Sequence, residues 1–461
     1  MFHVTTAAFR CHWDKERKNA SLMVSIDVVT RVLAELGIDF RERIFTPFVT
    51  LFAFLSQVFE DDHSCRHAVF EVCLLRCRQG LKPCSLKTAS YCEARARLPV
   101  AYFSRIAQHT ASAVEAMDES RWRWRHGKVI VVDGTAISMS DSVANSTHFP
   151  KQTSQKNDVG FPIARVLALF SLSTGALIDL VVSPWKGKGS GELSLLEKLW
   201  PHVGERETLL GDCLYSSYFV VAKALEKKAH VVAEFRKSRA WRLKKRASDQ
   251  IIKIERPARK NINCLSDEAY ERLPPHIIVR IVHVKCAPNG FRARSKYILT
   301  THLDSTVSCA DIAELYKQRW KVELNLRSIK SAMGMDFLYG QTPNMVEKEI
   351  WVYMIGYNLI RMAMCVAGKN AKCLPSDISF RAVQQWLALI RFSQAQNTNS
   401  NQDAITMLQL IARTETVGNR PNRYEPRCRK RRPKNYELLL ENRKVARAKL
   451  HKKHGRMPSR A

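Results

Sequence analysis

Apolar and charged residues alternate at helical spacing through the first quarter of the 461-residue chain. Stretches such as SIDVVTRVLAELGI and FTPFVTLFAFLSQVF place apolar residues at intervals of three and four. This recurrence is typical of amphipathic helices. We therefore predict a helical N-terminal region over residues 1–125.

Beyond this region the pattern changes to short continuous apolar runs that end in turn residues. Such runs are typical of strands that are buried on both faces. The strand-like runs are KVIVVDGT, ARVLALFSLST, ALIDLVVSPW, ETLLGDCLY and HVVAEF, and the helical stretches between the later ones are GELSLLEKLWPHV and SSYFVVAKALEKKA. This order predicts an α/β fold, in which a mixed sheet is flanked by helices.

Between residues 236 and 300 the chain is strand-like and strongly basic. HIIVRIVHVK and SKYILTTHL carry β-branched residues in alternation, which favours strands. Helical patterning returns at residue 308 and continues to about residue 412. We therefore divide the chain into a helical N-terminal region (1–125), an α/β domain (126–235 and 301–370), a β-rich basic insertion (236–300) and a helical C-terminal region with a basic tail (371–461).

Positive charge is concentrated in two segments of a chain whose formal net charge is +31. Residues 236–260 hold 11 basic and 2 acidic residues, and residues 420–461 hold 16 basic and 3 acidic residues. Lysine and arginine bind polyanions because they displace the counterions condensed on phosphates. The charge predicts a partner rich in phosphate, either nucleic acid or an anionic membrane surface.

Neither a membrane span nor secretion is expected. Asp179 and Arg361 interrupt the longest apolar stretches, whereas a span needs about 18 or more nearly uncharged residues. The N-terminus lacks the apolar run of a signal peptide. Within the densest group of cysteines, Cys65 to Cys92, no pair has the Cys-x2-Cys spacing of a zinc knuckle. Reduced core cysteines are therefore favoured over structural zinc, and we expect a cytoplasmic protein without a membrane partner.

Two aspartates stand at the ends of predicted strands, Asp133 in VIVVDG and Asp212 in TLLGDC. In α/β sheets, the carboxyl ends of the strands face the crevice in which ligands bind. A turn residue that only ends the strand is the alternative for each. Two such aspartates in one predicted sheet favour a shared site.

A third acid lies in the predicted helix DIAELYKQRWKVELNLRSIKSAMGM. At 100° per residue, Tyr316, Arg319, Glu323 and Lys330 fall within about 60° of one another, on one stripe beside the apolar face. A carboxylate flanked by two cations and a phenol suits a metal ligand between phosphate-binding groups. A solvated ladder of salt bridges is the alternative.

The spacing Tyr-x2-Arg-x3-Glu-x6-Lys, from Tyr316 to Lys330, resembles the signature of bacterial insertion-sequence transposases of the acidic-triad (DDE) type, in the group called insertion-sequence family four. Asp133 in a VDGT strand end is similar to the first acid of that family. Asp212 is similar to the second, since it stands in a GDxxY context with Tyr215. The β-rich insertion between the second and third acids, here 110 intervening residues, is similar as well.

This resemblance covers roughly residues 85–450 and implies a ribonuclease-H-like fold for the α/β domain. It implies that Asp133, Asp212 and Glu323 are catalytic and bind two divalent ions, Mg²⁺ or Mn²⁺. Carboxylate oxygens are ligands that Mg²⁺ prefers, and two metals about 4 Å apart can activate an attacking hydroxyl and stabilise a leaving one. The implied activity is DNA cleavage at transposon ends followed by transfer of the 3′-OH into target DNA.

The resemblance also implies DNA contacts by Tyr316, Arg319 and Lys330, to which we add Trp320 because it lies off the apolar face of the helix. The implied partners are double-stranded DNA, as terminal inverted repeats and as target, and a second copy in a synaptic dimer. The N-terminal region then binds DNA, and the protein acts in the bacterial cytoplasm at the nucleoid. The run RWRWRHGK is explained equally well by a DNA-contacting surface and by a half-exposed strand.

The chain departs from the family pattern at Cys213, where relatives often have arginine, and at Ala144, where a related pattern has glutamate. An aromatic residue that holds a flipped base is not assigned among Trp241, Phe291 and Tyr297, so hairpin chemistry stays open. Two other functions are alternatives. One is a ribonuclease-H-like DNA nuclease or resolvase without strand joining, and the other is a catalytically dead DNA-binding regulator.

Overall fold

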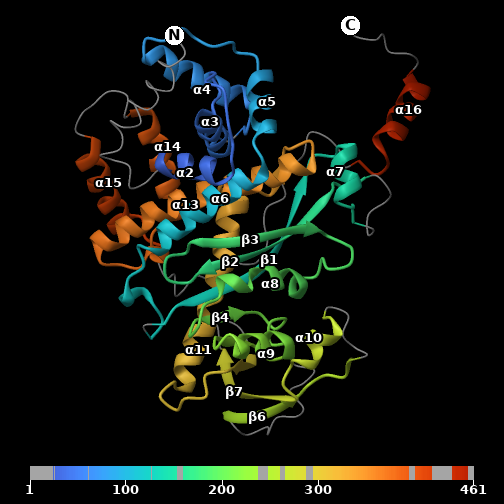
Figure 1. The fold of residues 1–461 in the computed structure, drawn as a ribbon, viewed down its shortest axis with the longest axis vertical. Helices are drawn as coiled ribbons and strands as arrows, with labels where there is room; N and C mark the ends of the chain where they lie inside the picture. Colours follow the sequence, from blue (N-terminus) through green and yellow to red (C-terminus); the bar gives the residue numbers. More distant parts are fainter. Residues whose placement is uncertain are drawn as a thin grey trace.

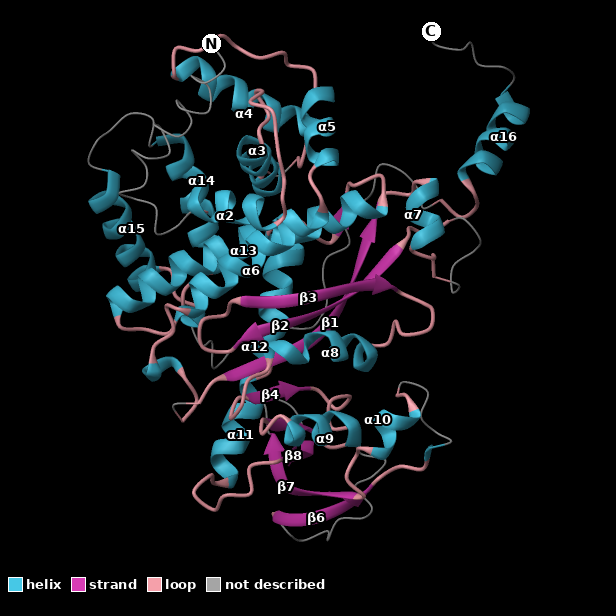
Figure 2. Ribbon diagram, in the orientation of Figure 1, coloured by secondary structure: helices cyan, strands magenta, loops and turns pink. Residues whose placement is uncertain are grey.

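The computed structural model describes residues 24, 26–60, 62–125, 127–152, 159–236, 248–259, 265–286, 294–393, 400–417 and 439–454. Within these residues the chain forms one mixed nine-stranded sheet that is flanked by helices (Figure 1, Figure 2). The predicted α/β fold is confirmed.

The strands lie in the order β3-β2-β1-β4-β5-β8-β7-β6, and β9 pairs with β1 outside this order. β1 is antiparallel to β2 and parallel to β4, which is in turn parallel to β5. The strands are β1 (Val129–Met139), β2 (Ile163–Ser171), β3 (Leu177–Pro184), β4 (Thr208–Gly211), β5 (His230–Glu234), β6 (Asp249–Glu255), β7 (His276–Cys286), β8 (Arg294–Thr300) and β9 (Phe337–Leu338).

β1 lies inside the sheet because its first residues are apolar toward both faces. Val129 and Val131 pack in the core cluster that includes the N-terminal helices, whereas Ile130 and Val132 pack in the opposite one. A strand that is covered on both faces needs a continuous apolar run instead of alternation. The run that precedes Asp133 therefore fixes this half-buried residue directly after a fully buried part of β1.

The β-rich insertion continues the main sheet. β8 pairs antiparallel with β5, with Thr300 opposite Val232, and β7 and β6 follow toward the edge. The strands predicted in HIIVRIVHVK and SKYILTTHL are confirmed as β7 and β8. Much of the basic run 236–260 lies outside the described residues. The division of the chain into domains stays a prediction.

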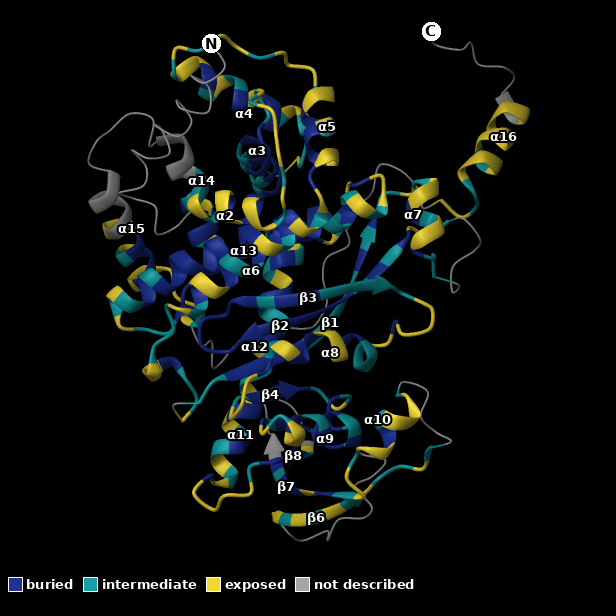
Figure 3. Ribbon diagram, viewed as in Figure 1, coloured by how far each residue is buried: buried dark blue, intermediate teal, exposed yellow. Residues whose placement is uncertain are grey.

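Helices cover both faces of the sheet. α8 and α9 pack on one face, and α2, α3, α6 and α11 to α15 contribute to the core on the other. The helices are α2 (Ile26–Glu35), α3 (Pro47–Phe59), α4 (Cys65–Arg78), α5 (Ala89–Arg97), α6 (Val100–Glu115), α7 (Val143–His148), α8 (Glu192–Leu199), α9 (Tyr218–Glu226), α10 (Asp267–Glu271), α11 (Cys309–Gln318), α12 (Trp320–Arg327), α13 (Pro343–Ala371), α14 (Phe380–Ser393), α15 (Ser400–Thr414) and α16 (Arg443–His454). Figure 3 shows α13 mostly buried and α16 exposed, away from the body of the protein.

α13 has the length and apolar character of a membrane-spanning helix, but 94% of its most apolar window is buried inside the protein. Its polar residues have internal partners. Asn358 exchanges two 2.9 Å hydrogen bonds with the backbone of Leu177, and Arg361 donates a 2.7 Å bond to the Tyr357 hydroxyl. These contacts identify α13 as the central helix of the core beneath the N-terminal helices.

Candidate active site

Asp133 and Asp212 lie level with each other on adjacent strands. β1 and β4 are parallel neighbours, and their last paired residues are Val131 and Leu210. Asp133 and Asp212 each stand two residues further along. Asp212 directly follows β4, whereas β1 continues to Met139, so Asp133 lies inside its strand and the expected strand end at Asp133 is wrong. Asp212 Oδ1 accepts a 2.7 Å bond from the Leu214 backbone, which fixes its side chain at the turn.

Asp133 carries a raised pKa. Burial, which disfavours the charged carboxylate, raises this pKa to about 6. A 2.9 Å hydrogen bond from the Gly134 backbone and the charge of Arg319 act in the opposite direction. The negative charges of Asp212 and Glu192 add to the rise. Negative charge is therefore concentrated around Asp133.

Glu323 approaches this region from α12, a helix that contacts β1. Its Oε1 accepts a 2.6 Å bond from Arg319 Nη2, and the Arg319 guanidinium also interacts electrostatically with Asp133. Arg319 thus shares its charge between two of the three predicted acids. Among the described residues, no three His, Cys, Asp or Glu side chains are grouped closely enough to hold a metal ion as they are placed.

The predicted continuous helix is wrong in detail. α11 ends at Gln318, and bonds from Arg319 N to Tyr316 O and from Val322 N to Arg319 O close tight three-residue turns there. After α12 the backbone forms a π-helix over Ser328–Ala332. Tight turns and π-turns change the rotation per residue, so a uniform 100° does not hold along this segment.

Three of the four signature side chains still interact with one another, since Arg319 interacts with both Tyr316 and Glu323. The Tyr316 hydroxyl donates a 2.9 Å bond to Glu234 on β5. Lys330 Nζ instead donates 2.9 and 3.2 Å bonds to Ala136 O and Thr135 Oγ1 on β1. The signature therefore ties its helical segment to two different strands of the sheet.

The residues predicted to contact DNA differ in exposure. Tyr316 is buried, and Lys296 lies 5.3 Å from the centre of its ring and forms a 2.7 Å ion pair with the same Glu234. Burial, with the nearby charge of Glu234, raises the Tyr316 pKa, so the phenol stays neutral. Trp320 is 51% exposed and is the open aromatic of this segment.

Glu192 and Tyr215 were not assigned a role from the sequence. Glu192 is the first residue of α8, and its carboxylate lies against Gly134, directly beside Asp133. The Tyr215 hydroxyl donates a 3.1 Å bond to Glu192. The usable signal was the glycine after Asp133, since a glycine within a strand often marks a close approach of another group.

Other aromatic candidates have structural partners or lie outside the described residues. Trp122 is buried, and Trp124 makes an edge contact at 5.4 Å with His302. Trp122 ends a short 3-10 helix, Ser120–Trp122, and β1 begins only at Val129, so the half-exposed strand expected for RWRWRHGK is not formed at Trp122. Tyr297 stacks on His283 at 4.9 Å. Trp241 and Phe291 lie outside the described residues.

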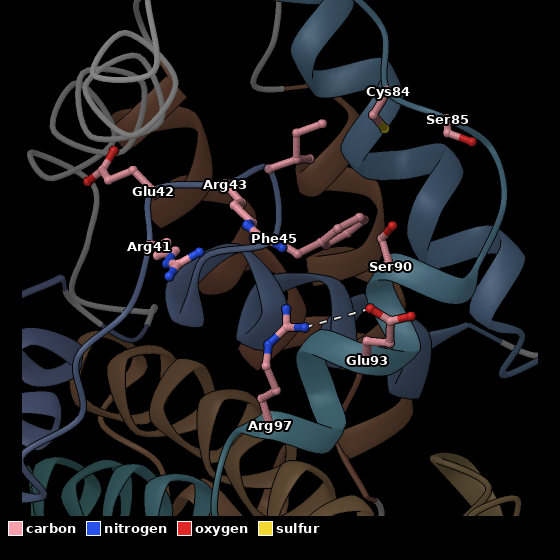
Figure 4. Close-up of a pocket in the computed structure, with 10 residues that line it drawn as sticks. Arg41, Glu42, Arg43, Phe45, Cys84, Ser85, Ser90, Glu93 and Arg97 are labelled. Carbon is pink, nitrogen blue, oxygen red and sulfur yellow. Dashed lines mark ion pairs between the residues drawn. The ribbon is translucent and has the colours of Figure 1, made fainter.

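A cavity of about 520 Å³ lies in the N-terminal helical region (Figure 4). None of the candidate acids lines it. Figure 4 shows the ion pair between Arg97 and Glu93, 3.7 Å apart, at one side of the cavity. The lining residues are Arg41, Glu42, Arg43, Ile44, Phe45, Cys84, Ser85, Ser90, Glu93 and Arg97.

Comparison with known proteins shows the family. The family model described as "Transposase DDE domain" matches residues 124–359, a span that contains all three candidate acids. The chain belongs to the DDE transposases. The sheet with its flanking helices agrees with the ribonuclease-H-like fold expected of this family.

Two named transposases resemble this DDE transposase. "Transposase InsG for insertion sequence element IS4" of Escherichia coli (strain K12) is 25% identical over 328 residues, which are 68% of this chain and 70% of that protein. "Probable transposase for insertion sequence element IS5377" of Geobacillus stearothermophilus is 34% identical over 73 residues, 16% of this chain and 19% of that protein. The resemblance to insertion-sequence family four is thereby confirmed, and the function is that of a DNA transposase. Nothing in these matches supports a separate nuclease or a regulator.

Proposed function

We propose that this transposase cleaves DNA at the ends of its element and joins the freed 3′-OH to target DNA, in a divalent-metal centre formed by Asp133, Asp212 and Glu323. The level placement of Asp133 and Asp212 on neighbouring parallel strands carries this proposal. The match of the transposase domain across all three acids supports it. DNA is the substrate, so we place the protein at the nucleoid of a bacterial cytoplasm.

The donor set suits Mg²⁺ or Mn²⁺. The candidate ligands are carboxylate oxygens, which hard divalent cations prefer. The raised pKa of Asp133 reflects burial together with neighbouring carboxylates, an arrangement that a bound cation relieves. When bound, two cations supply activation of the attacking hydroxyl and stabilisation of the leaving oxygen. The chain's part is to hold the carboxylates and the DNA backbone in line.

Arg319 competes with a cation for Glu323, because its guanidinium already occupies one of the two carboxylate oxygens. A DNA phosphate offers the guanidinium two acceptor oxygens in a fork that arginine fits well. Binding of the DNA backbone to Arg319 therefore releases Glu323 toward Asp133 and Asp212. DNA binding and metal binding consequently favour each other, so all three carboxylates bind the metal only when DNA is bound.

The remaining DNA contacts follow from exposure and charge. We assign Trp320 to a base or sugar face, because this indole is open. Lys330 supplies a point charge to a phosphate beside β1. Tyr316 reaches DNA only by exchanging its bond to Glu234. In the N-terminal region, Arg41, Arg43 and Arg97 around the cavity offer backbone contacts to the terminal repeats, and two copies bring two ends together as a dimer.

The experiment incubates the full-length protein with a labelled duplex that ends in the inverted repeat of the element. Nicked and joined products are followed in Mg²⁺, in Mn²⁺ and in a chelator. The proposal expects both products with either cation and none in the chelator, while the DNA still binds. Cleavage of equal rate in the chelator contradicts the metal-dependent mechanism.

A further inference from the structure

Glu192 lies close to Asp133 because the next residue of β1, Gly134, has no side chain. A Cβ atom added to Gly134 would lie 2.6 Å from Cδ and Oε1 of Glu192 and 3.0 Å from Oε2. Real Cβ atoms essentially never come so close, so a side chain here would displace the carboxylate of Glu192. Glycine after Asp133 therefore makes the space in which the carboxylate of Glu192 sits.

Gly211, the glycine before Asp212, makes space for Tyr215, which donates a hydrogen bond to Glu192. A Cβ added to Gly211 would lie 2.5–2.9 Å from Cβ, Cγ and Cδ2 of Tyr215. Tyr215 is fully buried, and its hydroxyl donates the 3.1 Å bond to Glu192 Oε2. Gly134 and Gly211 thus have matching roles, since each lets one member of the Glu192–Tyr215 pair approach the residue beside an aspartate.

Glu192 has no basic partner to neutralise it within the described part of the chain. Among the described residues, this half-buried carboxylate forms no ion pair with Lys, Arg or His. It accepts a hydrogen bond from the phenol of Tyr215. Glu192 lies in the first turn of α8, at the positive end of the helix dipole. A partly buried anion without a cationic partner is costly unless a cation binds there.

We propose that Glu192 is a fourth carboxylate of the catalytic centre and ligates a divalent cation together with Asp133. This proposal rests on the metal centre proposed above. Two divalent cations carry four positive charges, which three carboxylates leave partly uncompensated, and each Mg²⁺ takes six ligands. Tyr215 acts as a positioning residue, because its bond fixes Oε2 of Glu192 while Oε1 lies against Gly134, the residue after Asp133.

The test measures Mn²⁺ binding by titration calorimetry on the full-length protein in complex with an end-sequence duplex. Glu192→Gln keeps an oxygen that accepts the bond from Tyr215 but removes the charge. We expect its Mn²⁺ affinity to fall by about tenfold or more, the range seen when groups that support a metal site are removed. Glu197→Gln is the matched control, since Glu197 is exposed on the same helix, and its affinity should stay unchanged.

Asp133→Asn separates the two proposals. If Asp133→Asn loses Mn²⁺ binding while Glu192→Gln binds as tightly as the wild type, Glu192 is only a packing residue and this inference is overturned. If neither variant changes binding, the proposed metal centre fails as well. Melting in a chelator reports folding. If Glu192→Gln melts early, Glu192→Asp replaces it, and unchanged Mn²⁺ affinity in this shortened variant also overturns the inference.

Discussion

Arg319 donates a 2.6 Å bond to Glu323, the proposed third acid of the metal centre. In the proposed mechanism this contact restrains Glu323 as long as no DNA is bound. The candidates Asp133, Asp212 and Glu323 can be picked out from the apolar runs before the two aspartates and from the signature spacing, although β1 continues past Asp133. The pairing of Arg319 with Glu323 cannot be picked out in this way, because arginine four residues before glutamate is equally typical of a surface salt bridge. Side-chain partners of Glu192 also depend on contacts across the sheet that spacing does not encode.

Replacement of Arg319 tests this contact. Arg319→Ala frees Glu323, so Mn²⁺ affinity measured without DNA should rise several-fold, whereas affinity for end DNA should fall. Calorimetry and fluorescence anisotropy measure the two effects. Arg327→Ala, at an exposed position of the same helix, is the control and should change neither. Unchanged or weaker Mn²⁺ binding by Arg319→Ala would show that Arg319 does not restrain Glu323.

The stability of the fold also depends on pH through Glu349, which is not one of the three candidate acids of the active site. Burial raises its pKa from 4.5 to about 7, although the Tyr339 and Gly340 backbone amides donate to it. Unfolded glutamate ionises near the lower value, so folded stability falls as the pH rises through this interval and is constant above it. Glu349→Gln should remove this loss, which amounts to at most about 3 kcal/mol. Urea unfolding from pH 5 to 8 measures it, and parallel pH profiles for both proteins would contradict the assignment.

At the scale of elements, continuous apolar runs predict the strands well because β1, β4 and β5 are covered on both faces. The helical signature segment is harder to predict. Its residues have helical propensity throughout, whereas the tight turn at Arg319 and the π-helix over Ser328–Ala332 arise from tertiary contacts such as that of Lys330 with Ala136. Local periodicity does not contain this information.

Gly211 tests the packing between β4 and the turn that follows it. Gly211→Ala forces a methyl group into the Tyr215 ring and should cost about 1–3 kcal/mol of unfolding free energy, as overpacking does. Gly127→Ala is the control, because its added Cβ meets only Trp124 O at an ordinary 3.5 Å. Equal unfolding midpoints for both variants in urea would contradict the tight fit of Tyr215.

At the scale of the whole molecule, the sequence predicts the α/β class and the family but not the continuity of the sheet. The pairing of β8 with β5 joins residues about 70 positions apart, Val232 and Thr300. Such long-range pairing is set by packing and leaves no local pattern. The same limit applies to α13, whose apolar composition fits a core helix and a membrane span alike.

The basic tail is expected to bind DNA through charge alone. Each phosphate contact contributes about 0.9 to the slope of log affinity against log salt concentration. Replacing the four basic residues of the RKRR run by glutamine should therefore lower the slope by up to about 4. Anisotropy with end DNA at several salt concentrations measures it. Lys227 and Lys228 serve as a control pair, and an unchanged slope in the tail variant would exclude the tail from the interface. The replaced residues are Arg429, Lys430, Arg431 and Arg432.

The most direct measurement of the central claim is the yield of joined product in Mg²⁺ for the wild type and for Asp133→Asn, Asp212→Asn and Glu323→Gln. These changes keep size and hydrogen-bonding capacity but remove the charge of each carboxylate. The proposed centre predicts that all three variants bind end DNA as the wild type does and form no detectable product. Wild-type yield in any one of them would contradict the assignment of that residue to the catalytic triad.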